Sequence, residues 1–399
     1  MNIENTPSAQ PKTRARSKAT RTTKGLLIAL AASALAGVAA LSPGCNKTDT
    51  ASTTQPSAGS PITVGFLYVG TKDDYGYNQA HADGAAAVKA IPGVTVIEAE
   101  KVPETKDCQS TMETMINQGD ATLIFPTSFG YFKPHVQEVA KKFPKVTFLW
   151  AGKKLDPTDP PNCGSYFAYI DELEYLCGMA AGAATKSNKL GYIAAKPITP
   201  VLRDINAFEL GAKSVNPKAT TTVIFTGDWF LPNEEANGVT NLADQGVDVV
   251  TGHVDSPKVL IQTAEKRGLF SCGYHYNGSS LAPKGYLTGA EWNWGPMYVK
   301  FVTDFKAGNF KIPNGLMGDL KDGTVKMSPY GPGVSADTQA KIEDIKKQMT
   351  AGTFQMYKGP LNDNKGKEII PAGTSYGDED GWLWGMNYLV EGVVGNTGS

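Results

Sequence analysis

Aromatic rings and carboxylates follow many apolar segments of this chain, and together these residue types could hold a planar ring that contains nitrogen. Such a ring stacks on aromatic faces, while carboxylates and amides bind its N–H edge. A sugar ring would use the same residue types, so the composition leaves both ligands open. The ten candidates for direct ligand contact are Tyr77, Asn78, Phe129, Asp171, Trp229, Asp255, Tyr276, Asn277, Glu291 and Trp292.

Several of these residues also have an ordinary structural explanation. Aromatic side chains at strand ends often fill the contact between two packed units instead of touching a ligand. Asp171 and Asp228 precede apolar helical segments and could be helix N-caps. Asp255 or Ser256 could likewise cap a helix that Pro257 opens. The sequence leaves both explanations open for each residue.

The chain carries little that indicates catalysis. Its four histidines are scattered, and it contains neither a phosphate-binding loop that ends in Lys-Ser/Thr nor a His-Glu-x-x-His motif. The adjacent acids Asp73 and Asp74 could serve an exported nucleoside hydrolase that holds a metal or activates water. We expect instead a binding protein that is not an enzyme and needs no cofactor or metal.

Short strands and helices that alternate along the chain must position these residues. The alternation predicts parallel β-sheets. In open α/β sheets a ligand binds beyond the carboxyl ends of the strands, which is where the candidates stand. Strands are expected at 62–69, 94–99, 121–126, 146–151, 165–170, 190–195, 220–226, 247–251, 269–274 and 285–291. Helices are expected at 78–90, 108–118, 134–143, 172–185, 201–215, 232–245, 257–267, 295–307 and 342–349.

The α/β pattern restarts after residues 186–189, which predicts two lobes. We expect lobe 1 over residues 62–185, lobe 2 over residues 186–290, and a segment of residues 291–399 that crosses back and completes both lobes. The fold class is α/β. Two such units in succession indicate Rossmann-like lobes with parallel sheets, joined by a hinge, in a type I periplasmic-binding-protein architecture. The ligand would lie between the lobes.

The N-terminal 44 residues have the pattern of an export signal. Six basic residues precede the uncharged segment 25–41, whose length lies between that of a signal-peptide core and that of a membrane span. Cys45 follows the small residue Gly44, so we expect signal cleavage before Cys45, lipid on its thiol, and a flexible tether over residues 45–61. A plain secretory signal or an uncleaved anchor is the alternative, and either one exports the folded part.

Charge and cysteine content argue against two classes of partner. Without residues 1–44 the chain has 32 basic and 38 acidic residues, a formal net charge of −6, which argues against nucleic-acid binding. The remaining cysteines form no CxxC pair, which argues against a zinc site. Outside the cytoplasm they could form one or two disulfides or stay buried thiols, and the sequence assigns no pairing. They are Cys108, Cys163, Cys177 and Cys272.

Eight short motifs occur in a recognisable order along the body of the chain. They are Asp-Asp-Tyr-Gly-Tyr-Asn-Gln-Ala-His (73–81), Thr-Ser-Phe-Gly-Tyr (127–131), Tyr-Leu-Cys-Gly-Met-Ala-Ala-Gly (175–182), Ile-Asn-Ala-Phe-Glu-Leu-Gly-Ala (205–212), Asp-Trp-Phe-Leu-Pro (228–232), Gln-Gly-Val-Asp-Val-Val (245–250), Trp-Asn-Trp-Gly-Pro (292–296) and Glu-Gly-Val-Val-Gly (391–395). With them, residues 62–395 resemble the basic membrane protein family of ABC-transporter substrate-binding lipoproteins. Characterised members of that family bind purine nucleosides or related bases.

The resemblance implies a monomeric receptor, anchored by lipid at the extracytoplasmic face of the plasma membrane or in the periplasm. It would capture a purine nucleoside or base and pass it to an inner-membrane ABC permease. The resemblance places rings near the ligand at Tyr77, Phe129 and Trp229, and polar groups at Asn78, Asp171 and Asp255.

One departure from the family leaves the identity of the ligand open. Similar proteins often read Tyr-Asn-Ser-Asp after the strand that ends at Tyr274, whereas here His275, Tyr276 and Asn277 follow, so a carboxylate is missing. A sensor that docks on a signalling partner, or a binder of another solute such as a sugar, is the alternative function. A neighbouring permease gene or a neighbouring sensor-kinase gene would distinguish transport from sensing.

Overall fold

The computed structural model describes residues 59–377 and 380–398, which belong to one compact unit of the chain. The expected signal and Cys45, and nearly all of the expected tether, lie outside these residues. None of the described helices combines the length with the hydropathy that a membrane span requires.

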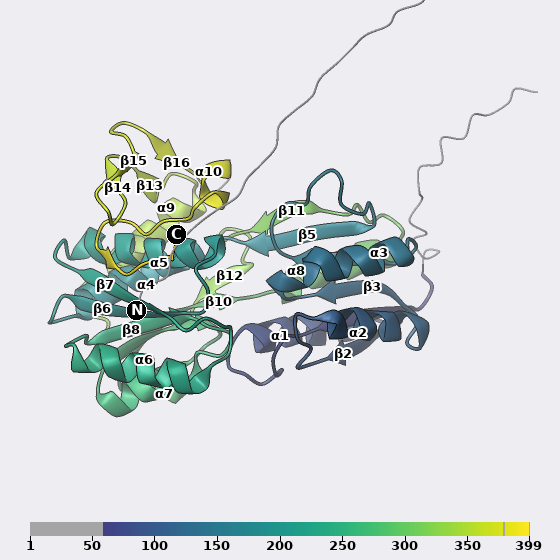
Figure 1. Cartoon of the computed structure of the whole chain (residues 1–399), viewed down its shortest axis with the longest axis horizontal. Helices are drawn as coiled ribbons and strands as arrows, with labels where there is room; N and C mark the ends of the chain where they lie inside the picture. The colour runs from purple at the N-terminus through teal and green to yellow at the C-terminus, as the bar shows by residue number, and fades with distance from the viewer. Residues whose placement is uncertain (1–58, 378–379, 399) are drawn as a thin grey trace, which may run out of the picture. The chain divides into compact units, whose positions relative to one another are not determined.

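The first sheet lies at the centre of one lobe and consists of six parallel strands (Figure 1). Its strand order is β11-β5-β4-β3-β1-β2. The strands are β1 (Ile62–Leu67), β2 (Val94–Ala99), β3 (Ala121–Pro126), β4 (Thr147–Ala151), β5 (Cys163–Ala168) and β11 (Asn314–Gly318). The helices of this lobe are α1 (Tyr77–Lys89), α2 (Lys106–Asn117), α3 (Gln137–Lys142) and α8 (Gly295–Lys306).

The second sheet has seven strands in the order β12-β10-β9-β8-β6-β7-β17, and only its edge strand β12 is antiparallel to its neighbour. The strands are β6 (Lys189–Ala194), β7 (Thr220–Phe225), β8 (Val249–His253), β9 (Phe270–His275), β10 (Tyr286–Trp292), β12 (Val325–Met327) and β17 (Val393–Val394). The helices of this lobe are α4 (Asp171–Ala184), α5 (Thr199–Val215), α6 (Pro232–Asp244), α7 (Lys258–Arg267) and α9 (Ala336–Thr350).

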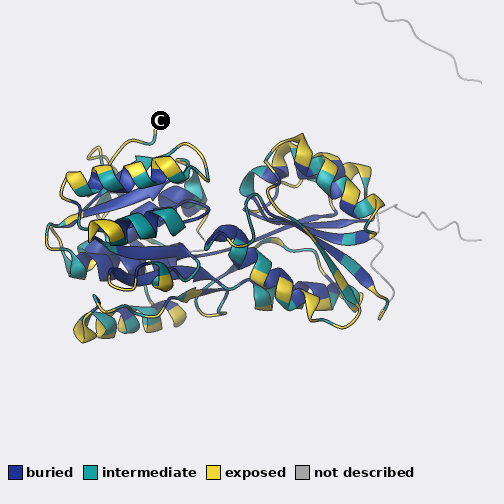
Figure 2. Ribbon diagram, turned by 90° about the horizontal axis from the view of Figure 1, so that it is seen from below, coloured by how far each residue is buried: buried dark blue, intermediate teal, exposed yellow. Residues whose placement is uncertain are grey.

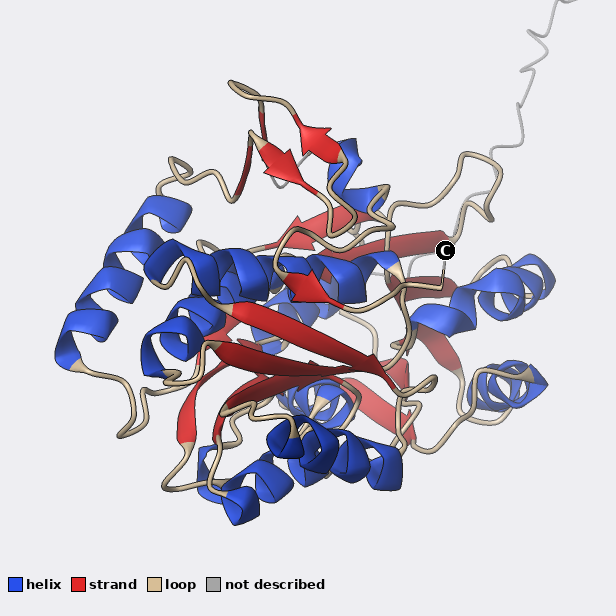
Figure 3. Ribbon diagram, turned by 60° about the vertical axis from the view of Figure 1, so that its left-hand side comes forward, coloured by secondary structure: helices blue, strands red, loops and turns tan. Residues whose placement is uncertain are grey.

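The chain passes between the two lobes three times, from β5 to α4, from β10 to α8, and from β11 to β12. Three crossings of this kind can act together as a hinge. The alternation of strands and helices that leads to them is visible in Figure 3. The α/β class and the type I binding-protein architecture predicted from the sequence are confirmed.

Most predicted elements coincide with observed ones within a few residues. The expected strands 94–99 and 121–126 are β2 and β3, and α7 ends as predicted at Gly268, whose φ of +71° closes the helix. The expected helix 342–349 is the second half of α9, which begins after the N-cap Ser335. Seven strands were missed, and all except β11 have only two or three residues, too few to show alternation. They are β11, β12, β13 (Tyr357–Lys358), β14 (Leu361–Asn362), β15 (Glu368–Ile370), β16 (Ser375–Tyr376) and β17.

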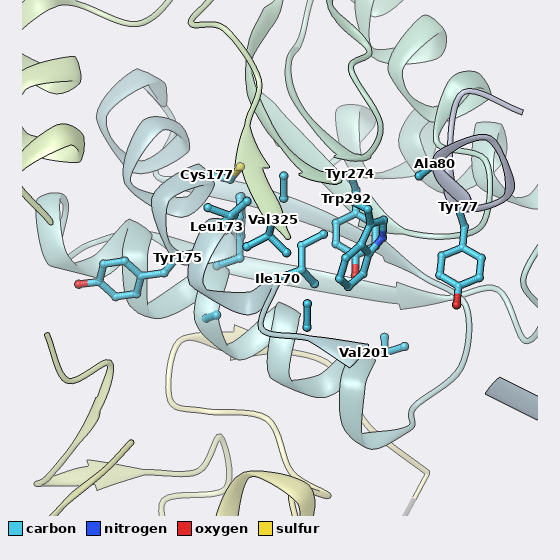
Figure 4. Close-up of a cluster of buried hydrophobic side chains, with 14 of the residues drawn as sticks. Tyr77, Ala80, Ile170, Leu173, Tyr175, Cys177, Val201, Tyr274, Trp292 and Val325 are labelled. Carbon is cyan, nitrogen blue, oxygen red and sulfur yellow. The ribbon is translucent and has the colours of Figure 1, made fainter. Parts of the chain in front are cut away.

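The strands of both sheets consist largely of buried residues, whereas exposed residues lie mainly on the helices and loops around them (Figure 2). One large cluster contains residues of both lobes, including Tyr77, Tyr274 and Trp292 (Figure 4). The sequence left open whether the four cysteines of the folded part form disulfides or stay as buried thiols. The structure shows buried free thiols at Cys108, Cys163, Cys177 and Cys272.

Helices α4 and α5 approach each other so closely that glycine is required at their contact. A Cβ atom on Gly211 would overlap the carbonyl oxygen of Tyr175, and one on Gly178 would overlap the carbonyl oxygen of Phe208. Since backbone atoms would have to move, we expect Gly211→Ala to lower the free energy of unfolding by about 1–3 kcal/mol, despite the higher helix propensity of alanine. Urea denaturation measures this change.

The matched control for this substitution is Gly381→Ala, because a Cβ atom at Gly381 meets no other atom within 4 Å. This control should leave the urea midpoint nearly unchanged. Equal midpoints for Gly211→Ala and the wild type would show that the two helices do not need this close contact.

Candidate functional site

Two adjoining cavities lie at the carboxyl ends of the strands of both sheets and share the side chains of Trp229 and Asp255. The outer cavity has a volume of about 550 Å³, which is within the usual range for small-molecule sites. The inner cavity, about 40 Å³, has room for only a few water molecules. The outer cavity therefore has room for a small molecule, and the inner one only for water or for the edge of a ligand.

Both lobes contribute to each cavity. The outer cavity is lined by Val69, Gly70, Thr71, Asp74, Asn78, Lys101, Pro103, Glu104 and Thr105 from one lobe, and by Lys196, Asp228, Trp229, Phe230 and Asp255 from the other. The inner cavity is lined by Tyr77, Ser128, Phe129 and Phe167 from one lobe, and by Ile198, Pro200, Trp229, His253, Asp255 and His275 from the other.

The loop between β1 and α1 is held rigidly by the carboxylate of Asp74. Its Oδ1 accepts hydrogen bonds from the backbone N–H groups of Gly76 and Gln79, and its Oδ2 accepts one from the Asn78 amide at 2.7 Å. The Oδ1 of Asn78 in turn accepts the backbone N–H of Gly70 at 3.0 Å. The Asn78 side chain is therefore fixed in orientation where it lines the outer cavity.

Two hydrogen bonds connect this loop to the loop after β8 in the other lobe. The backbone N–H of Tyr77 donates to the carbonyl oxygen of Asp255 at 2.8 Å, and the hydroxyl of Ser256 donates to the carbonyl oxygen of Asp74 at 2.5 Å. A side chain at Gly76 would overlap the Asp255 carbonyl, so glycine is needed for this approach. The contact brings Asp255 beside the first loop.

Asp255 and Asp74 are buried acids close to one another. Burial, followed by the charges of Asp74 and Glu104, raises the pKa of Asp255 well above its usual value, and a hydrogen bond from Asn78 opposes this shift only in part. Burial also raises the pKa of Asp74, against the hydrogen bonds that it accepts. The Asp255 carboxyl group is thus favoured in its neutral form, in which it both donates and accepts hydrogen bonds.

Aromatic side chains form the walls between these polar groups. The ring of Trp229 has the ammonium group of Lys196 5.2 Å from its centroid, and that ammonium group is 2.8 Å from Asp228 Oδ1. The ring centroid of Phe129 is 5.3 Å from that of Trp150. Tyr77 lies 5.2 Å from the ring of His275, and its hydroxyl donates to Thr127 O at 2.5 Å.

The structure brings half of the predicted contact residues together. Tyr77, Asn78, Phe129, Trp229 and Asp255 line the two cavities, three from one lobe and two from the other. Each of them follows the carboxyl end of a parallel strand, which is the position on which the prediction was based.

Asp171 and Trp292 do not line either cavity and have protein partners instead. Asp171 binds the guanidinium group of Arg203, with its Oδ1 2.8 Å and its Oδ2 2.7 Å from Nη2. The indole N–H of Trp292 donates to His275 Nδ1 at 2.7 Å. Ligand contact by these two residues stays a prediction without support from their positions.

The same holds for three further candidates. Glu291 accepts a hydrogen bond from the hydroxyl of Ser328 at 2.6 Å. Asn277 accepts the backbone N–H of Ser279 at 3.0 Å. The ring of Tyr276 packs edge-on against that of Tyr75, with the centroids 6.3 Å apart. None of the three lines the outer or the inner cavity.

The helix-capping alternatives are wrong for the candidate acids. The N-cap of α4 is Ile170, that of α6 is Leu231 and that of α7 is Pro257, and no side chain caps any of these helices. Asp171 is the first residue of α4, one position after its N-cap. Asp228, Asp255 and Ser256 lie before the N-caps of α6 and α7.

Three charged residues of the outer cavity were missed: Lys101, Glu104 and Lys196. Lys196 stands two positions after β6, so the rule that selected the other candidates would also have selected it. Glu104 lies five residues beyond the end of β2, where a long loop returns to the cavity, and no local pattern indicated this. Glu104 accepts hydrogen bonds from Ser128 and from the backbone of Gly130.

The described residues give no positive sign of catalysis. Within residues 59–377 and 380–398, no group of three or more His, Cys, Asp or Glu side chains could hold a metal ion. Gly373–Gly377 matches the Gly-x-Ser-x-Gly pattern of serine hydrolases, but its Ser375 is exposed on β16 of a two-stranded sheet and does not stand at a strand-to-helix turn.

Comparison with known proteins identifies the family of the chain. Residues 62–358 match the family model of PnrA-like ABC transporter substrate-binding proteins. A purine-binding protein of Brucella abortus is 35% identical over 335 residues, which span 83% of this chain and 93% of the relative. A protein of Haloferax volcanii named as an ABC transporter glucose-binding protein is 31% identical over 346 residues, 86% of this chain and 83% of that protein.

A solved structure shows the same fold at lower identity. The ABC transporter solute-binding protein of Conexibacter woesei aligns with a TM-score of 0.59 and 21% identity, over 74% of this chain and 98% of that protein. The chain therefore belongs to the PnrA-like family of ABC transporter substrate-binding proteins.

Proposed function

We propose that this substrate-binding protein closes on a purine base or purine nucleoside in the cleft between its lobes and delivers it to an ABC permease. The observation that carries the proposal is the buried Asp255 carboxyl group beside the Trp229 ring, where the two cavities meet. A purine offers a flat face for the ring and an edge of alternating donors and acceptors for the carboxyl group.

The charges around the outer cavity favour an uncharged ligand. Four acidic side chains line it, whereas Lys101 and Lys196 are its only lining cations among the described residues, and Lys196 is already paired with Asp228. A phosphate group would meet an excess of carboxylates. We therefore propose bases and nucleosides, and not nucleotides, as the ligand class.

Closure of the two lobes would report that the ligand is bound. Only a ligand that touches both lobes stabilises the closed state over the open one, and both cavities take side chains from both lobes. Further parts of the proposal are export by the N-terminal signal, a lipid on Cys45 and activity as a monomer. A neighbouring permease gene would favour transport over the alternative role as a sensor.

A thermal-shift screen of residues 51–399 tests the proposed ligand class. Adenosine, guanosine, inosine, their free bases, their monophosphates and glucose would be compared, because a ligand that binds only the folded state raises Tm with its concentration. We expect a rise with a base or a nucleoside and none with a monophosphate. Stabilisation by glucose and by no purine would keep the fold assignment and overturn the purine proposal.

Replacing Trp229 by alanine is expected to weaken binding of that ligand roughly tenfold or more. Stacking alone contributes about 0.5–1.5 kcal/mol beyond the burial of apolar area, and each 1.4 kcal/mol changes affinity tenfold. Titration calorimetry measures the loss. The matched control is Trp382→Ala, since Trp382 stacks on Tyr376 in the C-terminal segment and lines neither cavity. Equal affinity of Trp229→Ala and wild type would remove Trp229 from the site.

A further inference from the structure

His253 stands at the carboxyl end of β8 and lines the inner cavity, where its imidazole is tied to a buried acid behind it. Its Nδ1 is 2.6 Å from Oδ2 of Asp204, a residue of α5 that is only 2% exposed. The hydroxyl of Tyr274 donates to the same Asp204 oxygen at 2.6 Å. Asp204 thus has two partners on one oxygen and orients the imidazole through Nδ1.

The oxygen of Asp204 that faces His253 is a hydrogen-bond acceptor. The Tyr274 hydroxyl already donates to this Oδ2 atom, which lies 2.6 Å from Nδ1 of His253. Because an accepting oxygen needs a donor opposite it, Nδ1 of His253 carries a proton.

In the neutral imidazole with its proton on Nδ1, the other ring nitrogen of His253, Nε2, offers a lone pair. Nε2 has no hydrogen-bond partner in the described part of the chain. It is also not fully buried. With Nδ1 bound behind it and the ring lining the inner cavity, Nε2 is accessible to a ligand.

Most other polar groups of the inner cavity are already occupied. The Tyr77 hydroxyl donates to Thr127 O, and the Ser128 hydroxyl donates to Glu104. His275 receives the indole N–H of Trp292 at Nδ1 and also bonds to the backbone of Val254. Among the described side chains that line the inner cavity, His253 Nε2, the indole N–H of Trp229 and the Asp255 carboxyl group remain to bind an edge of a ligand.

We propose that His253, held in its Nδ1–H tautomer by Asp204 and Tyr274, determines specificity by accepting a hydrogen bond from an amino or ring N–H group of the ligand. Asp204 acts as a positioning residue through His253. This inference rests on the proposed function, since it names the edge that the same cleft selects. A heterocycle with a donor at that edge would bind more tightly than its analogue without the donor, because the analogue leaves Nε2 without a partner.

Pairs of purines that differ by one amino group test the role of His253. Calorimetry would compare adenosine with purine riboside and guanosine with inosine. The amino-group ratio is the affinity for the compound with the amino group divided by the affinity for the compound without it. In the wild type we expect this ratio to be about ten in at least one pair. This ratio should fall to about one in His253→Phe and persist in part in His253→Gln, whose side-chain oxygen can still accept. His135→Gln is the control, because His135 bonds to Gln109 and lines neither cavity.

The tautomer can be measured without any ligand. In protein labelled with ¹⁵N-histidine, NMR should show His253 with a protonated Nδ1 and a bare Nε2, with its signals assigned by their loss in His253→Phe. Asp204→Asn should disturb this tautomer and lower the amino-group ratio, because an amide in place of the carboxylate can impose the wrong tautomer on its histidine. A role in stability alone would leave the ratio unchanged.

The outcomes separate this inference from the proposed function. If the wild type binds no purine, the proposed function fails, and the ¹⁵N spectra still decide whether Asp204 fixes the tautomer. If purines bind and the amino-group ratio is the same in His253→Phe as in the wild type, the specificity role is overturned while the purine proposal stands. A proton on Nε2 in the free wild type would overturn the positioning role of Asp204.

Discussion

Asp255→Ala is expected to lower the affinity for the purine ligand by thirtyfold or more. The Asp255 carboxyl group is buried, shared by both cavities and held beside the Asn78 amide. A buried donor or acceptor that loses its partner costs about 1–3 kcal/mol. Because a neutral carboxyl group both donates and accepts, its removal should cost about 2 kcal/mol or more, and each 1.4 kcal/mol is a factor of ten in affinity. Titration calorimetry of wild type and variant at pH 7 measures the difference.

The matched variant Asp255→Asn should keep the affinity within about tenfold of the wild type. An amide has one donor edge and one acceptor edge, as a neutral carboxyl group does. If Asp255→Asn loses as much affinity as Asp255→Ala, the ligand needs the ionised carboxylate, and the assignment of a neutral acid to this site is wrong.

The same acid should affect stability in a pH-dependent way. Because the pKa of Asp255 is higher in the folded state than in the unfolded chain, its contribution to stability is fully present below about pH 3.9 and is lost as the pH rises through the raised folded value. In the absence of ligand, the Tm of Asp255→Asn minus the Tm of the wild type should therefore increase as the pH rises from 4 to 8. A Tm difference that is constant with pH would show that Asp255 ionises normally.

Arg203→Ala is expected to lower the free energy of unfolding by about 3–5 kcal/mol. The Arg203 and Asp171 side chains are only 4% and 3% exposed, and two guanidinium nitrogens bind the carboxylate. Removal of the cation leaves a buried carboxylate without its partner. Urea denaturation of the ligand-free protein measures the loss.

The double variant Arg203→Met/Asp171→Leu is the control for this pair. Replacing both ions by apolar groups of similar size removes the uncompensated charge, so most of the lost stability should return. Its ligand affinity also tests the sequence-based prediction for Asp171. A folded double variant with wild-type affinity would assign Asp171 a structural role, whereas a folded double variant that has lost binding would support ligand contact. If Arg203→Ala is as stable as the wild type, the ion pair does not matter for the fold.

The sequence could show which residues directly follow a parallel strand, and this position predicted part of the site. It placed Tyr77, Asn78 and Phe129 in one lobe, and Trp229 and Asp255 in the other, because the carboxyl ends of all these strands meet at the cleft. The regular alternation of long apolar segments similarly revealed most strands and helices of both sheets.

The same signal could not tell which strand-end side chains are already bound by the protein. Asp171 is paired with Arg203, 32 positions further along the chain, and Glu291 is bonded to Ser328, 37 positions away. Such partners come together only in the folded chain. Asp204 was missed for a related reason: it lies within α5 and reaches the cavity only through His253.

The crossing strands were missed because their sequences carry almost no pattern. β12 has three residues and β11 alternates exposed with partly buried positions, so neither shows an apolar run. Both strands are defined by pairing with a distant partner, β11 with β5 and β12 with β10. Sequence periodicity reports local structure and cannot supply such pairing.

Calorimetric titration of residues 51–399 with purine bases, purine nucleosides and glucose, for both wild type and Asp255→Ala, tests the proposed purine receptor most directly. The predicted result is saturable binding of a base or nucleoside to the wild type with one ligand per chain, weakened at least thirtyfold in Asp255→Ala, with no heat from glucose. Saturable binding of glucose with no heat from any purine would contradict it.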